Sequence, residues 1–88
     1  MLQTMGCNPR NFNELDLYSL PSPCFVIDKK ALRSNLEVLK KLKFETNVKI
    51  LIALKAFSTL SLAPLISEYL DGCCSSGLYE TKLAAKYF

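Results

Sequence analysis

A lysine that directly follows a continuous apolar run is the residue of this sequence best placed to do chemistry. Residues Ile50 to Leu54 are all apolar, and Lys55 follows them without a spacer. An unbroken run of this kind is typical of a parallel strand that is covered on both faces. In barrel and doubly wound α/β folds the carboxyl ends of such strands open into the site, so we expect Lys55 where substrates bind.

Lysine has a specific use at such a position. An ammonium group withdrawn from water has a lowered pKa, and the neutral amine that results is a nucleophile that can form a Schiff base. A plainer interpretation fits the same spacing, in which the side chain of Lys55 ends a buried strand and extends its charge into water. The spacing alone does not exclude either interpretation.

Length and composition indicate one small folded domain at most. The chain has 88 residues, of which 50% are hydrophobic and 22% charged, and its formal net charge is +3. The apolar fraction is ample for a core, and the chain has no low-complexity tract. Its lysines are scattered and do not gather with arginines and aromatic residues into a stripe, so we expect no nucleic-acid partner.

The four cysteines form neither a metal motif nor a disulfide motif. They are Cys7, Cys24, Cys73 and Cys74, there is no Cys-x-x-Cys pair, and the chain has no histidine. We expect no metal site, and we expect the cysteines to be small buried residues in a reducing compartment. No apolar run approaches the ~20 residues of a membrane span, and the first residues lack a signal-peptide pattern. We therefore expect a cytoplasmic protein without a membrane partner.

The expected elements alternate between strand and helix. Residues 1–20 predict a polar lead-in, and residues 21–88 predict the first β/α units of a barrel domain. Three strands are expected, at Cys24–Ile27, Val48–Leu54 and Cys73–Ser76. Three helices are expected: one from Lys29 to about Phe44 with Asp28 as its N-cap, one from a cap at Ser61 to a stop at Gly72, and one opened by Gly77. Pro64 would lie in the first turn of the second helix.

This alternation predicts an α/β fold with right-handed crossovers and a parallel sheet. A complete (β/α)8 barrel takes ~250 residues, far more than this chain has. We therefore interpret the chain as the N-terminal fragment of a (β/α)8 TIM-type barrel. A very small open α/β domain is the alternative.

Three separated stretches of the sequence resemble one enzyme family. They are Leu-Pro-Ser-Pro-Cys-Phe-Val-Ile-Asp (20–28), Ile-Leu-Ile-Ala-Leu-Lys-Ala-Phe-Ser (50–58), and Glu-Tyr-Leu-Asp-Gly followed by Ser-Ser-Gly-Leu-Tyr-Glu (within 68–80). Over about 17–88, without a gap, the chain resembles the N-terminal part of the carboxynorspermidine (carboxyspermidine) decarboxylases. These are alanine-racemase-like, fold type III enzymes that use pyridoxal 5'-phosphate, like the ornithine and diaminopimelate decarboxylases.

The resemblance implies roles for particular residues. Lys55 matches the family's Schiff-base lysine, which holds pyridoxal phosphate, and Ala53 would face the same barrel interior and leave room for the ring. Ser76 matches a strand-end serine near the cofactor, and a helix cap is the alternative interpretation of this residue. Relatives that act on ornithine carry an aspartate where this chain has Cys73, so any acid contribution from that strand is in doubt.

The resemblance also implies a function for the whole protein. It would be a lyase of polyamine (spermidine) biosynthesis that converts carboxynorspermidine or carboxyspermidine to norspermidine or spermidine, as a homodimer. The glycine-rich phosphate-binding loop, the acidic partner of the pyridine nitrogen and the C-terminal β domain would lie beyond Phe88. We therefore expect the 88-residue chain alone to be inactive and prone to aggregation. Two alternatives stay open: another fold type III decarboxylase or racemase, and a non-catalytic remnant or binding module.

Overall fold

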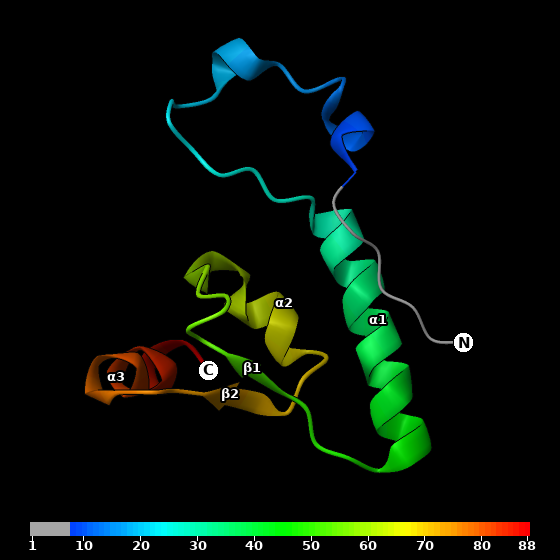
Figure 1. Cartoon of the computed structure of the whole chain (residues 1–88), viewed down its shortest axis with the longest axis vertical. Coiled ribbons are helices and arrows are strands. Elements are labelled where there is room, and N and C mark those ends of the chain that lie inside the picture. Colours follow the sequence, from blue (N-terminus) through cyan, green and yellow to red (C-terminus); the bar gives the residue numbers. More distant parts are fainter. Residues whose placement is uncertain (1–7) are drawn as a thin grey trace.

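The structure is a computed structural model that describes residues 8–88, and within this range it is an α/β fold with two parallel strands (Figure 1). The α-helices are α1 (Lys29–Thr46), α2 (Ala63–Ser67) and α3 (Leu78–Tyr87), and the strands are β1 (Leu51–Ala53) and β2 (Gly72–Cys74). Short 3-10 helices are η1 (Pro9–Phe12), η2 (Leu17–Ser19) and η3 (Leu60–Leu62). The predicted α/β class is confirmed, and the predicted barrel stays a prediction.

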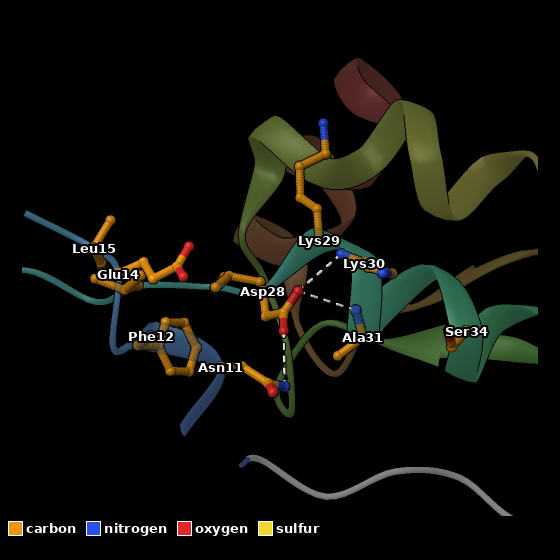
Figure 2. Close-up of a pocket in the computed structure, with 11 residues that line it drawn as sticks. Asn11, Phe12, Glu14, Leu15, Asp28, Lys29, Lys30, Ala31 and Ser34 are labelled. Carbon is orange, nitrogen blue, oxygen red and sulfur yellow. Dashed lines mark hydrogen bonds between the residues drawn. The ribbon is translucent and has the colours of Figure 1, made fainter. Parts of the chain in front are cut away.

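Helix α1 begins and ends for local reasons. The Asp28 carboxylate accepts hydrogen bonds from the backbone N–H of Lys30 at 3.0 Å and of Ala31 at 3.1 Å, which confirms the predicted N-cap (Figure 2). The helix ends at Thr46 because Asn47 adopts a left-handed conformation with φ 55° and donates its N–H to the Lys43 carbonyl at 2.8 Å. The helix therefore runs slightly past the predicted end near Phe44.

The lead-in approaches α1 at this capped end. The side-chain amide of Asn11 donates to the second carboxylate oxygen of Asp28 at 3.2 Å, beside a hollow of about 870 Å³ (Figure 2). Asp28 thus connects residues 8–20 to the helix as well as capping it. The first seven residues of the predicted lead-in, with Cys7, lie outside the described residues.

Strands β1 and β2 pair in parallel, with Leu51 opposite Gly72, Ile52 opposite Cys73 and Ala53 opposite Cys74. Flanking hydrogen bonds extend the pairing by one residue at each end, from Asp71 N to Ile50 O at 2.9 Å and from Leu54 N to Cys74 O at 3.2 Å. Both strands are shorter than predicted. Val48 and Lys49 precede β1 and lie outside the strand, and Ser75 and Ser76 follow β2 and lead into α3.

The predicted strand at Cys24–Ile27 is wrong. Residues 24–28 have no regular secondary structure and pair with neither β1 nor β2, and Phe25 is fully exposed. Pro21 and Pro23 favour extended backbone around this segment, which is the local part of the prediction. A strand also needs a partner, and that requirement depends on residues far along the chain.

Two predicted boundaries of the second helix are also wrong. Ser61 lies inside η3 and caps nothing, whereas Pro64 occupies the first turn of α2 as predicted. Gly72 does not end the helix but begins β2. Its φ is 154°, a backbone conformation that residues other than glycine rarely adopt. Four apolar residues that are spaced three or four positions apart in this segment are all buried: Leu62, Leu65, Ile66 and Tyr69.

The core lies between α1, the η3–α2 segment and one face of β1. Its buried members are Leu36, Leu62, Leu65, Ile66, Tyr69 and Leu70, and Ile50 and Ile52 of the β1 segment pack against them. Leu51, between these two isoleucines, is 51% exposed. One face of this strand is therefore open within residues 8–88, as expected for a fragment of a barrel, although an unbroken apolar run is typical of a strand covered on both faces. Within the same range, no helix is both long and apolar enough to cross a membrane.

The cysteines differ from their predicted environment. Cys24, Cys73 and Cys74 carry free thiols, and Cys24 and Cys74 are exposed, whereas Cys73 is half-buried. The predicted burial is therefore wrong for Cys24 and Cys74. Cys74 is exposed because it lies on the face of the sheet that no helix covers.

Replacing Asp28 by alanine should lower the free energy of unfolding by about 1 kcal/mol, because the first-turn amides of α1 lose their acceptor. Urea unfolding followed by circular dichroism measures this change. The control is Asp16→Ala, which removes the equivalent cap of the three-residue η2, where Asp16 accepts from Tyr18 N at 3.0 Å. Equal losses in both variants would contradict a special role for the α1 cap.

Candidate active site

Lys55 lies just beyond the carboxyl end of β1, at the position that the sequence predicts. The chain turns there, because the backbone N–H groups of Ala56 and Phe57 both donate to the Ala53 carbonyl, at 3.0 and 3.1 Å. Leu54 is 3% exposed, whereas Lys55 is exposed. The turn thus buries the last apolar residue of the run and leaves the amine at the edge of the sheet.

The strand register separates two faces of the sheet. In a parallel pair, residues opposite each other share a face, and successive residues alternate between faces. Ile52 packs against the core, so Ile52 and Cys73 belong to the helix-covered face. The other face, called the open face below, carries Leu51, Ala53, Gly72 and Cys74. A Cβ added to Gly72 would lie 3.6 Å from Leu51 Cδ2, which agrees with this assignment.

Lys55 and Ser76 both follow the carboxyl ends of the paired strands. Each lies two residues beyond the last pair of the ladder, Ala53 and Cys74. The amine of Lys55 makes no ion pair or hydrogen bond with any residue that the structure describes, and the same holds for the hydroxyl of Ser76. Two polar groups without a partner among the described residues therefore lie at the carboxyl edge of the sheet. Ala53, which has a small side chain, lies two residues before Lys55.

Ser76 does not cap α3, so the alternative interpretation of this residue is wrong. The N-cap is Gly77, which has no side chain to accept a hydrogen bond. The backbone N–H of Ser76 donates instead to the carboxylate of Glu80, in the first turn of α3. The hydroxyl of Ser76 is consequently not used by the helix. Gly77 does open α3, as predicted.

The two adjacent cysteines lie on opposite faces. Cys73, which stands where some relatives carry an aspartate, belongs to the helix-covered face and contributes no group to the open face. Cys74 belongs to the open face, and the sequence analysis did not identify it. The signal that could have found it is the two-residue alternation counted back from Ser76. Within residues 8–88 there is no cluster of three or more potential metal ligands.

Three hollows of the described chain lie away from Lys55. One lies between residues 11–15 and the start of α1, one lies beside Asp71, and an apolar one of about 290 Å³ lies between α1 and β1. Lys55 and Ser76 line none of these three. The structure brings the two residues to one edge, and residues 8–88 do not enclose it.

Asp71 holds the opposite, amino edge of the sheet. Its carboxylate accepts a hydrogen bond from Ile50 N at 2.8 Å and pairs with Lys43 of α1 at 3.0 Å. The hydrogen bond from Ile50 and then that from Lys43 favour the charged form and hold the pKa of Asp71 below its ordinary value of 3.8. Lys43 also donates to the Tyr69 carbonyl at 2.9 Å, so one lysine ties α1 to the sheet.

Comparison with known proteins finds homologous decarboxylases. The chain is 42% identical over 69 residues to a carboxynorspermidine/carboxyspermidine decarboxylase of Herminiimonas arsenicoxydans, covering 78% of this chain and 19% of that protein. It is 37% identical over 81 residues to a carboxyaminopropylagmatine decarboxylase of Synechocystis sp., covering 92% of this chain and 19% of that protein. A carboxynorspermidine/carboxyspermidine decarboxylase of Campylobacter jejuni is 35% identical over 68 residues, covering 77% and 18%.

The chain is therefore homologous over most of its length to these decarboxylases, and the resemblance inferred from the sequence is confirmed. It spans 18 to 19% of the length of the curated relatives that it matches. No protein-family profile matches the chain, and no solved structure matches it.

The lowered pKa of Asp71 predicts a pH dependence of stability. The folded state binds this proton more weakly than the unfolded state, so the contribution of Asp71 is fully present above pH 3.8 and is lost as the pH falls through the lowered pKa. In the wild type, the urea midpoint should therefore fall between about pH 5 and pH 2.

The matching variant is Asp71→Asn, which should have a lower urea midpoint at neutral pH and a flatter dependence in the acid range. The control is Glu45→Gln, which removes a longer, exposed ion pair with Lys41 at 4.0 Å. An Asp71→Asn variant with the full acid dependence of the wild type would show that another carboxylate is responsible.

Proposed function

We propose that this chain is the N-terminal part of a pyridoxal-phosphate-dependent decarboxylase of polyamine synthesis that acts on carboxynorspermidine or carboxyspermidine. The observation that carries the proposal is the position of Lys55, whose amine lies unpaired at the carboxyl edge of a parallel strand pair. Homology over most of the chain to decarboxylases named for carboxylated polyamines supports it. Residues 21–88 would then form the first β/α units of a barrel.

The residues at this edge fit the proposed cofactor. Pyridoxal phosphate supplies an aldehyde that a lysine amine can hold covalently, and a ring that accepts the electron pair left when carbon dioxide departs. Lys55 offers an amine that no described residue engages. Ala53 and Cys74 form the last pair of the ladder before Lys55 and are small, so the open face has room for a flat ring there. Ser76 adds a free hydroxyl at the same edge.

Within this proposal each residue has a limited task. Lys55 holds the cofactor through Nζ and, when released, can take up or return a proton at that atom. Ala53 leaves space, and Ser76 donates or accepts one hydrogen bond. Exclusion of water, which such chemistry needs, is not supplied by residues 8–88, because the open face is exposed. The rest of the protein would have to cover it.

The names of the relatives leave the choice of substrate among three related compounds. Two of the relatives are named for carboxynorspermidine or carboxyspermidine, and the third, which matches the largest share of this chain, is named for carboxyaminopropylagmatine. Decarboxylation assays of the full-length protein with each compound distinguish them. A higher kcat/KM for carboxyaminopropylagmatine would replace the proposed substrate and keep the proposed reaction.

Replacing Lys55 by alanine in the full-length protein should reduce decarboxylation by on the order of 10³-fold or more, because the amine that holds the cofactor is lost. Borohydride treatment followed by peptide mass analysis should find the reduced cofactor on Lys55 in the wild type and on no residue in the variant. The control is Lys49→Ala, which removes a lysine that precedes the amino end of β1. A Lys55→Ala enzyme with the wild-type rate would refute the proposal.

The 88-residue chain alone should be inactive and should aggregate, because its open face exposes apolar surface. Leu51→Thr should reduce light scattering and binding of a hydrophobic dye, since Leu51 is 51% exposed on that face. The control is Leu17→Thr, which removes a leucine that is 70% exposed in the lead-in. Equal effects of both substitutions would contradict a specific role of the open face.

A further inference from the structure

We propose that Glu80 is a positioning residue of the candidate active site, which holds the Ser75–Gly77 turn so that the hydroxyl of Ser76 stays available beside Lys55. This inference rests on the proposed function, because it assigns Ser76 to the cofactor or substrate. Its subject is Glu80, to which the resemblance gives no role.

Glu80 holds the residue that precedes the N-cap of α3. The first amides of a helix need acceptors, and the N-cap residue usually supplies one from its side chain. Gly77 occupies the N-cap of α3 and has no side chain to supply. Glu80 reaches back from the first turn, and its carboxylate accepts the hydrogen bond of Ser76 N. This is a variant of the capping box, with the bond made one residue before the N-cap.

The remaining polar groups of the turn are used within it, with one exception. The Thr81 hydroxyl lies 2.9 Å from the Ser75 hydroxyl and donates to the Gly77 carbonyl, also at 2.9 Å. Ser75 is therefore engaged with α3, whereas the exposed hydroxyl of Ser76 has no partner among residues 8–88.

Removing Glu80 should redirect Ser76. Serine is a favoured N-cap residue, and without the glutamate the free amides at the start of α3 would attract the Ser76 hydroxyl. The hydroxyl would then accept a hydrogen bond from a first-turn amide of α3 and would no longer be available to the cofactor or substrate. Glu80→Ala should therefore lower the free energy of unfolding only a little, because the Ser76 hydroxyl would supply the cap that α3 lacks. The same change should weaken cofactor binding beside Lys55.

The test uses the full-length apoenzyme and titrates it with pyridoxal phosphate, followed by absorbance. Ser76→Ala should weaken cofactor affinity about tenfold, and Glu80→Ala by a similar factor. The double variant should be no weaker than either single variant, because Glu80 acts through Ser76. Glu80→Gln should stay within about twofold of the wild type, since its amide oxygen can still accept from Ser76 N. Glu45→Ala, which removes an exposed carboxylate of α1, is the control and should change nothing.

Urea unfolding of the same proteins separates positioning from folding. A Glu80→Ala variant that loses stability but keeps cofactor affinity would overturn the inference, and so would additive losses of affinity in the double variant. If Glu80→Ala does not fold, Glu80→Asp replaces it, because the shorter side chain does not reach Ser76 N and should give the same loss. A wild type in which borohydride traps no cofactor on Lys55 would instead refute the proposed function itself.

Discussion

The hydrogen bonds between Ile50 and Asp71 are the constraint on which the rest of this structure depends. Ile50 N donates to the Asp71 carboxylate, and Asp71 N donates to the Ile50 carbonyl, so one residue holds both backbone groups at the start of the ladder. A shift of one residue in the pairing would move every side chain to the opposite face of the sheet. The position of Lys55 and Ser76 at the same carboxyl edge therefore depends on the hydrogen bonds that Asp71 makes at the amino edge.

The sheet that this contact aligns is covered on one side only. Ile50, Ile52 and Leu54 contribute to the apolar side with α1 and α2, while Leu51, Ala53 and Gly72 remain on the open face. A sheet with one uncovered face and two unpaired edges leaves apolar side chains and backbone hydrogen-bonding groups exposed to water. The homologous decarboxylases are about four to five times as long as this chain, since the 68 to 81 matched residues are only 18 to 19% of them. We expect the additional segments of such a longer protein to cover the open face, because the proposed chemistry requires that water be excluded from it.

Glycine and small side chains shape the candidate site as much as the lysine does. Gly72 adopts a backbone conformation that other residues rarely adopt, and it leaves the open face flat beside Leu51. Gly77 leaves the first turn of α3 without a side-chain cap, which gives Glu80 its task. Between them lie Cys74 and Ser76, which carry a thiol and a hydroxyl toward the edge that Lys55 occupies. The candidate site is thus a flat surface with one amine and one hydroxyl at its rim.

The sequence by itself determined the features that depend on neighbouring residues. Asp28 as the cap of α1, Pro64 in the first turn of α2 and Gly77 at the start of α3 all follow from local backbone chemistry. The placement of Lys55 after an apolar strand is equally local. The resemblance of three short stretches added the relation to decarboxylases.

Only the tertiary structure decided which segments pair and which face each side chain takes. Cys24–Ile27 has the residues of a strand but no partner, and Gly72 begins a strand although its neighbours predict a helix stop. Cys73 and Cys74 are identical in type and are told apart by the register alone, and Ser75 and Ser76 by the contacts of Glu80 and Thr81. The physical reason is that strand pairing and burial join residues about 20 positions apart, which no local pattern specifies.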